Sequence, residues 1–298
     1  MEVFGGLCCN VTVALLAVAL LVISCFFESR DPLRYYAKYV LYAVYSSIVA
    51  VTMLPYVLLS PKDVRNSADA SVLLRYYTKL LGIEWDIRGT EELGKERGCV
   101  IVANHQSALD ILGMFNAWHV MGKCAAVARN EVFYVFPFGP IAWLAGVVFI
   151  SRNNGKESMK KLSETAHLVR NRATKLFIFP EGTRNKNILG NGLQPFKKGA
   201  FRIAIENQVP LLPMVYSPYY FIEGKIRFFG HGKIIVKTLE AIPTEGLEIK
   251  DVDELIEKTR SLMQKEFEAL ASEVLATLPE DYPANVAQRN QFLKVEHS

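Results

Sequence analysis

Charge is scarce in this chain, and no stretch concentrates it. Only 21% of the 298 residues are Asp, Glu, Lys or Arg, and the formal net charge is +4. No block of five or more consecutive Lys and Arg residues occurs, so we expect no nucleic-acid partner. A weakly basic protein of this kind is better suited to an anionic lipid surface or a phosphorylated substrate.

Cysteine and histidine are also few, and their spacing matches no metal site. The chain has five residues of each type. No Cys-x2-Cys pair is present, and an odd, irregularly spaced set of cysteines does not indicate a disulfide framework. The histidines are scattered at positions 105, 119, 167, 231 and 297. We therefore expect no metal ion and no other cofactor.

Three common catalytic signatures are missing as well. The chain has no Gly-x-Ser-x-Gly nucleophile elbow, no Walker A loop, and no Gly-x-Gly-x-x-Gly loop after a strand. Cys99 and Cys124 lie inside apolar segments, where a thiol is usually inert packing. No side chain therefore stands out as the nucleophile of a covalent intermediate.

Apolar residues, in contrast, make up 51% of the chain. Two uncharged runs, at about 4–27 and 39–59, are each long enough to cross a bilayer. A signal peptide is the alternative for the first run, but Glu2 stands where a basic residue is expected and no convincing cleavage site precedes Glu28. We predict a two-helix membrane hairpin over residues 1–60. Its orientation, and whether it spans or re-enters the bilayer, stay open because the flanking cations favour neither side.

The rest of the chain predicts one α/β domain over residues 61–278, followed by a polar tail at 279–298. Short, mainly apolar runs predict strands at 100–103, 124–128, 147–151, 176–179, 211–216, 226–229 and 233–239, with a turn at 230–232. Apolar residues at three- and four-residue spacing predict helices at 156–172 and 251–278. A further helix is expected at 200–207.

The segment 104–110, Asn-His-Gln-Ser-Ala-Leu-Asp, follows the first of these strands. His105 thus lies at a strand end, where α/β folds commonly place their chemistry. Asp110 can fold back to His105 if a helix starts near Ser107, as the Ser-x-x-Asp capping pattern predicts. We interpret the pair as a general base, His105, oriented by Asp110. The alternative is a capped helix beside an ordinary loop histidine.

Cationic residues follow several other segments. The sequence Phe-Pro-Glu-Gly-Thr-Arg at 179–184 ends a strand, Arg152 ends another, and Lys197 and Lys198 precede a helix. An arginine such as Arg184 can offer a bidentate fork to a phosphate, and Glu181 could orient it or bind a substrate hydroxyl. Each residue alone could form a surface ion pair, but together they predict an anion site.

The segment 209–213, Val-Pro-Leu-Leu-Pro, contains two prolines. Proline cannot donate to a sheet ladder, so the segment predicts an irregular or edge strand. Its apolar side chains either line a groove or pack in the core.

In order and spacing, the segments 104–110, 146–152, 179–184 and 209–213 resemble the four motifs of the glycerolipid acyltransferases, the PlsC-like family. The resemblance covers roughly residues 90–245. The sequence that flanks these motifs is most similar to that of the animal 1-acylglycerol-3-phosphate acyltransferases of the endoplasmic reticulum. It implies a mixed sheet with flanking helices and an integral protein of the endoplasmic reticulum membrane. It indicates no oligomeric state.

The reaction that the resemblance implies transfers a fatty acyl group from acyl-CoA to the sn-2 hydroxyl of lysophosphatidic acid, giving phosphatidic acid and CoA. His105 and Asp110 would be the catalytic pair, with no acyl-enzyme. Backbone N–H groups near Ser107 are a candidate oxyanion hole. The substrate phosphate would be bound by Arg184 first, with Arg152, Glu181, Gly182, Thr183, Lys197 and Lys198. The acyl or CoA groove would include Val209, Leu211 and Pro213.

Three alternatives remain open at this point. The same chemistry could act on another lysophospholipid or on glycerol 3-phosphate. Water could replace the acceptor, which would make the protein an acyl-CoA hydrolase. The fold could also serve as a non-catalytic, lipid-binding membrane scaffold.

Overall fold

The computed structural model describes residues 32–151, 173–185 and 192–283, together with residues 19, 160, 164 and 169. Three predicted segments therefore lie mostly outside the described residues. They are the first membrane helix at 4–27, the helix at 156–172, and the polar tail at 279–298.

A seven-stranded sheet forms the centre of the molecule, in the order β1-β9-β6-β2-β5-β3-β4. Neighbouring strands are parallel except β6 and β9, so the mixed sheet that we expected is present. The strands are β1 (Ile83–Arg88), β2 (Cys99–Ala103), β3 (Cys124–Arg129), β4 (Val148–Ile150), β5 (Lys175–Ile178), β6 (Leu211–Tyr216) and β9 (Gly232–Thr238). Because β2, β3 and β5 are parallel, the segments that follow them meet at one edge of the sheet.

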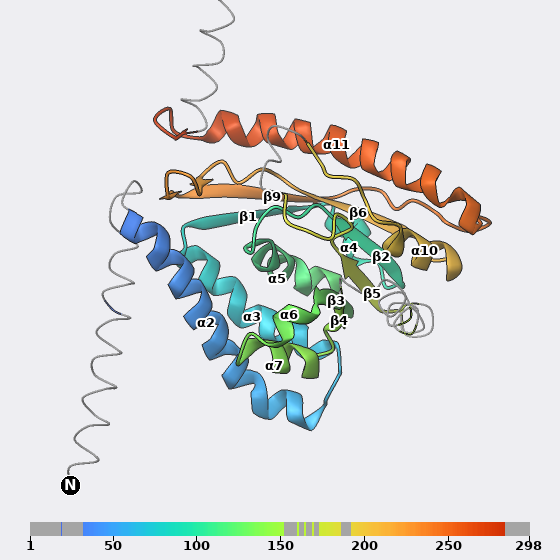
Figure 1. Cartoon of the computed structure of the whole chain (residues 1–298), viewed down its shortest axis with the longest axis horizontal. Helices are drawn as coiled ribbons and strands as arrows, with labels where there is room; N and C mark the ends of the chain where they lie inside the picture. The colour runs from blue at the N-terminus through green and yellow to red at the C-terminus, as the bar shows by residue number, and fades with distance from the viewer. Residues whose placement is uncertain are drawn as a thin grey trace, which may run out of the picture.

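Helices cover both faces of this sheet (Figure 1). One face is covered by α10 (Lys198–Glu206) and the long α11 (Val252–Thr277), and the other by α3 (Arg65–Leu80), α5 (Asp110–Met121) and α2 (Pro32–Leu59). Side chains of the central strand β2 alternate between the two resulting cores: Ile101 points into one, and Val100 and Val102 into the other. Shorter helices are α4 (Thr90–Gly94), α6 (Asn130–Phe133), α7 (Phe138–Leu144) and the 3-10 helix η1 (Ile249–Asp251).

Helix α2 contains the second predicted membrane run but begins at Pro32 rather than at residue 39. It is long and apolar enough to cross a membrane. It also packs against the α/β domain, where Leu41 and Val49 join the core. The Lys38 side chain is fully buried, its Nζ donates to the Gly230 carbonyl at 2.9 Å, and the ammonium lies 4.3 Å from the Phe229 ring centroid. The described residues thus contain one helix of the predicted hairpin, and that helix is part of the folded domain.

Of the two expectations for the segment 209–213, an irregular or an edge strand, the edge strand is wrong. Strand β6 lies between β2 and β9 in the middle of the sheet. Leu211 pairs with Ile242 while Met214 pairs with Thr238, so the partner segment carries one extra residue beside Pro213. Bulges of this kind tolerate a missing N–H donor, which explains why proline fits an interior strand here.

Two further elements differ from expectation. Strand β1 was not predicted, although Ile83, Trp85 and Ile87 alternate with charged residues. The turn at 230–232 does not join two paired strands, because β8 (Phe228–Phe229) pairs with β7 (Ile222–Glu223) and β9 pairs with β1 and β6. The turn instead passes the chain from a small hairpin to the main sheet.

Candidate active site

The loop after β2 brings His105 and Asp110 together. The His105 Nδ1 atom lies 2.6 Å from Asp110 Oδ2. Because a carboxylate only accepts, Nδ1 carries the proton in this contact, and Nε2 is left as the basic nitrogen. His105 lines a cavity, while Asp110 is fully buried. The predicted pairing is thus present in the structure.

Helix α5 begins at Asp110, later than the capping pattern predicted. The Ser107 hydroxyl accepts the N–H of Leu109 at 3.2 Å, and Asp110 Oδ2 accepts the N–H groups of Gln106 at 2.7 Å and Ser107 at 3.0 Å. These backbone donors are therefore occupied. The expectation that N–H groups near Ser107 form an oxyanion hole stays a prediction, and these three donors are not available for it.

A tyrosine that sequence reasoning missed completes the surroundings of Asp110. The Tyr219 hydroxyl donates to Asp110 Oδ1 at 2.5 Å. Tyr219 follows β6 and is 109 positions away in the chain, so only the pairing of β6 with β2 brings it near. The motif that ends in Pro213 points to this strand, but no sequence signal singles out the tyrosine.

Polar side chains fix the rest of the loop to β6. The Asn104 amide donates to the Tyr216 carbonyl at 3.0 Å and accepts the Tyr216 N–H at 2.8 Å. The Gln106 amide donates to the Ser217 carbonyl at 2.8 Å. The side-chain amides on either side of His105 are thus held by the end of β6 and the residue after it, which restricts where the imidazole can lie.

Glu181 supports the same loop from the segment after β5. Its carboxylate accepts the backbone N–H of His105 at 2.9 Å and that of Gln194 at 3.3 Å, and only 3% of the residue is exposed. Burial raises the pKa of Glu181 to about 7, although these two N–H donors oppose the shift. Both carboxylate oxygens bond to backbone, so Glu181 acts on the loop rather than on Arg184. Phe179 stacks on the His105 ring with centroids 4.1 Å apart.

Several cations gather beside this pair. Arg184 and Lys197 line the same cavity as His105. Gly182 has a φ of +66°, and a Cβ at this position would lie 2.9 Å from Lys197 Nζ, so the lysine lies directly over the glycine. Sequence reasoning missed Arg129 at the end of β3, whose Nη2 donates to the Gly182 carbonyl at 3.2 Å. The signal was available, because β3 ends at the same sheet edge as β2 and β5.

Other predicted site residues lie elsewhere. Lys198 forms an ion pair with Asp253 at 2.7 Å and does not line the cavity. Val209, Leu211 and Pro213 are buried in or beside β6, and none of them lines the cavity, because the chain there is core. Thr183 is exposed, and Arg152 lies outside the described residues.

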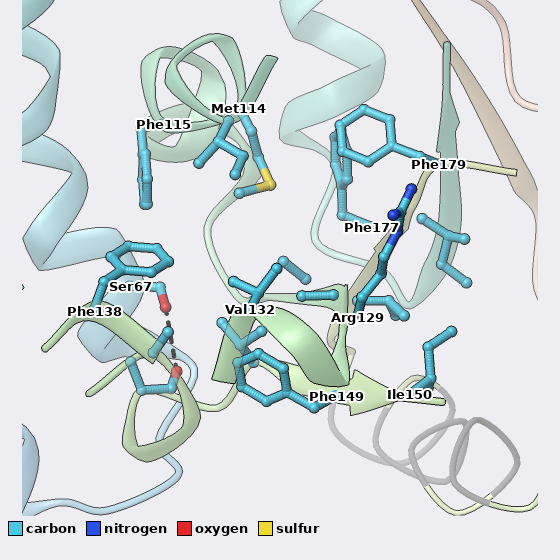
Figure 2. Close-up of a pocket in the computed structure, with 18 of the residues that line it drawn as sticks. Ser67, Met114, Phe115, Arg129, Val132, Phe138, Phe149, Ile150, Phe177 and Phe179 are labelled. Atoms are coloured by element: carbon cyan, nitrogen blue, oxygen red, sulfur yellow. Dashed lines mark hydrogen bonds between the residues drawn. The ribbon is translucent and has the colours of Figure 1, made fainter. Parts of the chain in front are cut away.

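The cavity has a volume of about 540 Å³ and two chemically different ends. Its polar end holds His105, Arg129, Gly182, Arg184 and Lys197. Its larger apolar part runs between α2, α3, α5 and α7 and is lined by residues such as Val49, Leu74, Met114, Phe115, Phe138 and Ile141. In Figure 2, Arg129 extends past Phe177 toward Phe179, and Phe115 and Phe138 lie on the other side of the pocket. Such a cavity suits an amphiphile with an anionic head.

Comparison with known proteins places this arrangement in a class. The family model described as Acyltransferase matches residues 84–217, which include the His105–Asp110 loop and the Glu181–Arg184 segment. A crystal structure of the 1-acyl-sn-glycerophosphate (LPA) acyltransferase PlsC from Thermotoga maritima has the same fold, with a TM-score of 0.61 at 20% identity. The superposition covers 86% of this chain and 97% of that one.

Curated sequences narrow the class. Human 1-acyl-sn-glycerol-3-phosphate acyltransferase beta is 35% identical over 255 residues, which is 85% of this chain and 90% of the relative. The bovine alpha form is 34% identical over 80% of this chain and 82% of its own length. The chain belongs to the 1-acyl-sn-glycerol-3-phosphate acyltransferase family.

Proposed function

We propose that the protein transfers a fatty acyl group from acyl-CoA to the sn-2 hydroxyl of lysophosphatidic acid, giving phosphatidic acid and CoA. The observation that carries this proposal is the position of His105, paired with the buried Asp110, in a cavity that has a cationic end and an apolar end. The names of the family members cited above give the acceptor. The acyl donor and the roles of individual residues are part of the proposal.

The chemistry follows from the atoms that the pair leaves available. His105 Nε2 removes the proton of the acceptor hydroxyl as its oxygen attacks the thioester carbonyl. The tetrahedral intermediate then expels CoA as a thiolate, which regains a proton from the imidazolium. General-base assistance of this kind typically contributes about 10²–10⁴ in rate. Asp110 stabilises the imidazolium and holds its tautomer, so no protein nucleophile, metal or cofactor is needed.

The acceptor phosphate is proposed to lie among Arg129, Lys197 and Arg184. Arg129 is anchored by its bond to the Gly182 carbonyl, and Lys197 lies over Gly182. Two arginines and a lysine from separate segments supply the charge-assisted hydrogen bonds that a phosphate needs. This cluster of cations favours a phosphorylated acceptor over water, because water carries no charge for the cations to bind.

Because the acceptor and the acyl chain are lipids, we expect the protein to act at a membrane. The outward face of α2 exposes apolar side chains, among them Leu33, Ile48, Val51, Leu58 and Leu59. The inward face of the same helix lines the apolar part of the cavity with Val49, Ala50, Met53 and Val57. We propose that α2 lies in the bilayer of the endoplasmic reticulum. The cavity would then be open to lipid chains on its bilayer side, while CoA stays in water.

The proposal is tested by CoA release from oleoyl-CoA with purified full-length protein. The acceptors are lysophosphatidic acid, lysophosphatidylcholine, glycerol 3-phosphate and none, for wild type and His105→Ala. Release that requires lysophosphatidic acid and disappears in His105→Ala supports the proposal. Release without acceptor would indicate a hydrolase, and preference for another acceptor would change the substrate. A folded protein that releases no CoA would indicate a scaffold.

A further inference from the structure

Tyr219 makes a contact with the catalytic pair that the proposed mechanism does not use. It is buried beside Phe221 in the core, and its hydroxyl donates to Asp110 Oδ1 at 2.5 Å. The other carboxylate oxygen, Oδ2, has three donors: His105 Nδ1 and the N–H groups of Gln106 and Ser107. Within the described part of the chain, Tyr219 provides the one hydrogen bond recorded for Oδ1.

This single contact fixes the rotation of the carboxylate. With Oδ2 alone bonded, the Asp110 carboxylate could still rotate over a range of side-chain angles. The bond from the buried Tyr219 phenol to Oδ1 restricts the plane of the carboxylate. Asp110 is also fully buried, so an Oδ1 without a donor would have no water to replace it. The phenol thus supports both the direction and the charge of the group that orients His105.

We propose that Tyr219 is a positioning residue of the acyl transfer, which holds the Asp110 carboxylate in the anionic, correctly rotated form that His105 requires. The inference rests on the proposed function, because it assigns a role within that reaction. Tyr219 acts through Asp110 and touches no reacting atom.

The effect on pH dependence has a definite sign. The His105–Asp110 pair carries one negative charge when the imidazole is neutral and none when it is protonated. A donor to Asp110 therefore favours the neutral imidazole, which is the form that acts as a base. Removing the phenol makes the pair bind its proton more tightly, so activity is lost at a higher pH on the acid side.

Other titratable groups face Asp110 from the elements packed around it. Tyr42 comes from α2, Tyr216 from β6 and Glu181 from the segment after β5, and all three interact electrostatically with Asp110. None of them is altered when only the Tyr219 hydroxyl is removed. The Tyr219→Phe substitution therefore isolates the contact with Oδ1.

The experiment compares wild type, Tyr219→Phe and Tyr220→Phe as full-length proteins. Tyr220 is the matched control, since its ring packs against the other core and its hydroxyl has no recorded bond within the described residues. We expect Tyr219→Phe to move the acidic limb of kcat/KM upward by about one pH unit and to lower kcat near pH 7 about tenfold. We expect KM to stay within about twofold, and Tyr220→Phe to match wild type.

A second readout does not require turnover. In protein with isotope-labelled histidine, the NMR titration of His105, assigned by comparison with His105→Ala, should move to higher pH in Tyr219→Phe. An unmoved titration and acidic limb would overturn the inference, even if the variant were less stable or less active. If wild type transfers no acyl group, the proposed reaction fails, while the titration still decides whether Tyr219 acts on the pair.

Discussion

The backbone N–H of His105 donates to the buried carboxylate of Glu181 at 2.9 Å, so two strand-end motifs meet through a bond from the main chain of one to a side chain of the other. The catalytic loop after β2 is thereby attached to the Glu181–Arg184 segment after β5. The second contact between them, from the Asn185 N–H to the His105 carbonyl at 2.7 Å, holds the other side of the same residue. The backbone of His105 is thus fixed from both sides.

Glu181 should make the stability of the protein depend on pH. Its pKa is raised from the ordinary value of 4.5 to about 7, so between these values the folded state binds more protons than the unfolded state. The free energy of unfolding therefore falls as pH rises from 4.5 to 7, by on the order of 3 kcal/mol from this group. Chemical denaturation at a series of pH values should show this slope in wild type and not in Glu181→Gln. An equal slope in both proteins would contradict the assignment.

Asp110→Asn should abolish most activity while leaving the fold intact. The asparagine amide has one acceptor oxygen where the carboxylate has two, Oδ1 and Oδ2. It also carries no negative charge to neutralise an imidazolium at His105. We expect kcat to fall by about 10²–10⁴, with an unchanged circular dichroism spectrum. Asp253→Asn is the control, because that carboxylate pairs with Lys198 on the surface and should retain wild-type kcat. A comparable loss in both variants would exclude a specific role.

Arg129→Met should weaken binding of the phosphorylated acceptor. A charge-assisted hydrogen bond is worth about 1.5–3 kcal/mol, so KM for lysophosphatidic acid should rise about 10- to 100-fold with little change in KM for acyl-CoA. Lys198→Met removes a cation that was predicted for the site but pairs with Asp253 outside the cavity. Initial-rate kinetics should place its KM values within about twofold of wild type. A larger increase in KM for lysophosphatidic acid in Lys198→Met than in Arg129→Met would instead indicate that Lys198 binds the phosphate.

Gly182→Ala should lower both stability and acceptor affinity. A side chain at a φ of +66° costs about 1–2 kcal/mol, and the new methyl would collide with Lys197 at 2.8 Å from Cε. Gly122→Ala separates the two effects, since Gly122 has a φ of +68° and open space where its Cβ would lie. Thermal denaturation should show both variants destabilised, whereas only Gly182→Ala should raise KM for lysophosphatidic acid.

Local pattern predicted most of the sheet and the contact between His105 and Asp110. The apolar runs that form β2, β5 and β6 are buried on both faces, which is why these strands are apolar along most of their length. His105 and Asp110 were recognisable because the loop between them is short and contains its own capping residues. The same reasoning would have found β1 had the alternation of Ile83, Trp85 and Ile87 been weighed, since that edge strand is half-buried.

The remaining site residues depend on distant pairing that no local pattern encodes. Tyr219 reaches Asp110 only because β6 lies beside β2, and Arg129 reaches Gly182 only because β3 lies beside β5. Pro213 led to the wrong expectation of an edge strand. A bulge in the distant partner segment removes the need for an N–H at this position, and the local sequence does not show that bulge. Lys198 shows that neighbours in sequence can point to different surfaces at the start of a helix.

The buried Lys38 has a consequence for how a bilayer would act on this protein. Its bond to the Gly230 carbonyl attaches α2 just before β9 begins at Gly232. Tilting or sliding α2 alone would break this bond and the contact of the ammonium with the Phe229 ring. With α2 in a bilayer, a displacement of the helix would therefore act directly on the segment that leads into β9.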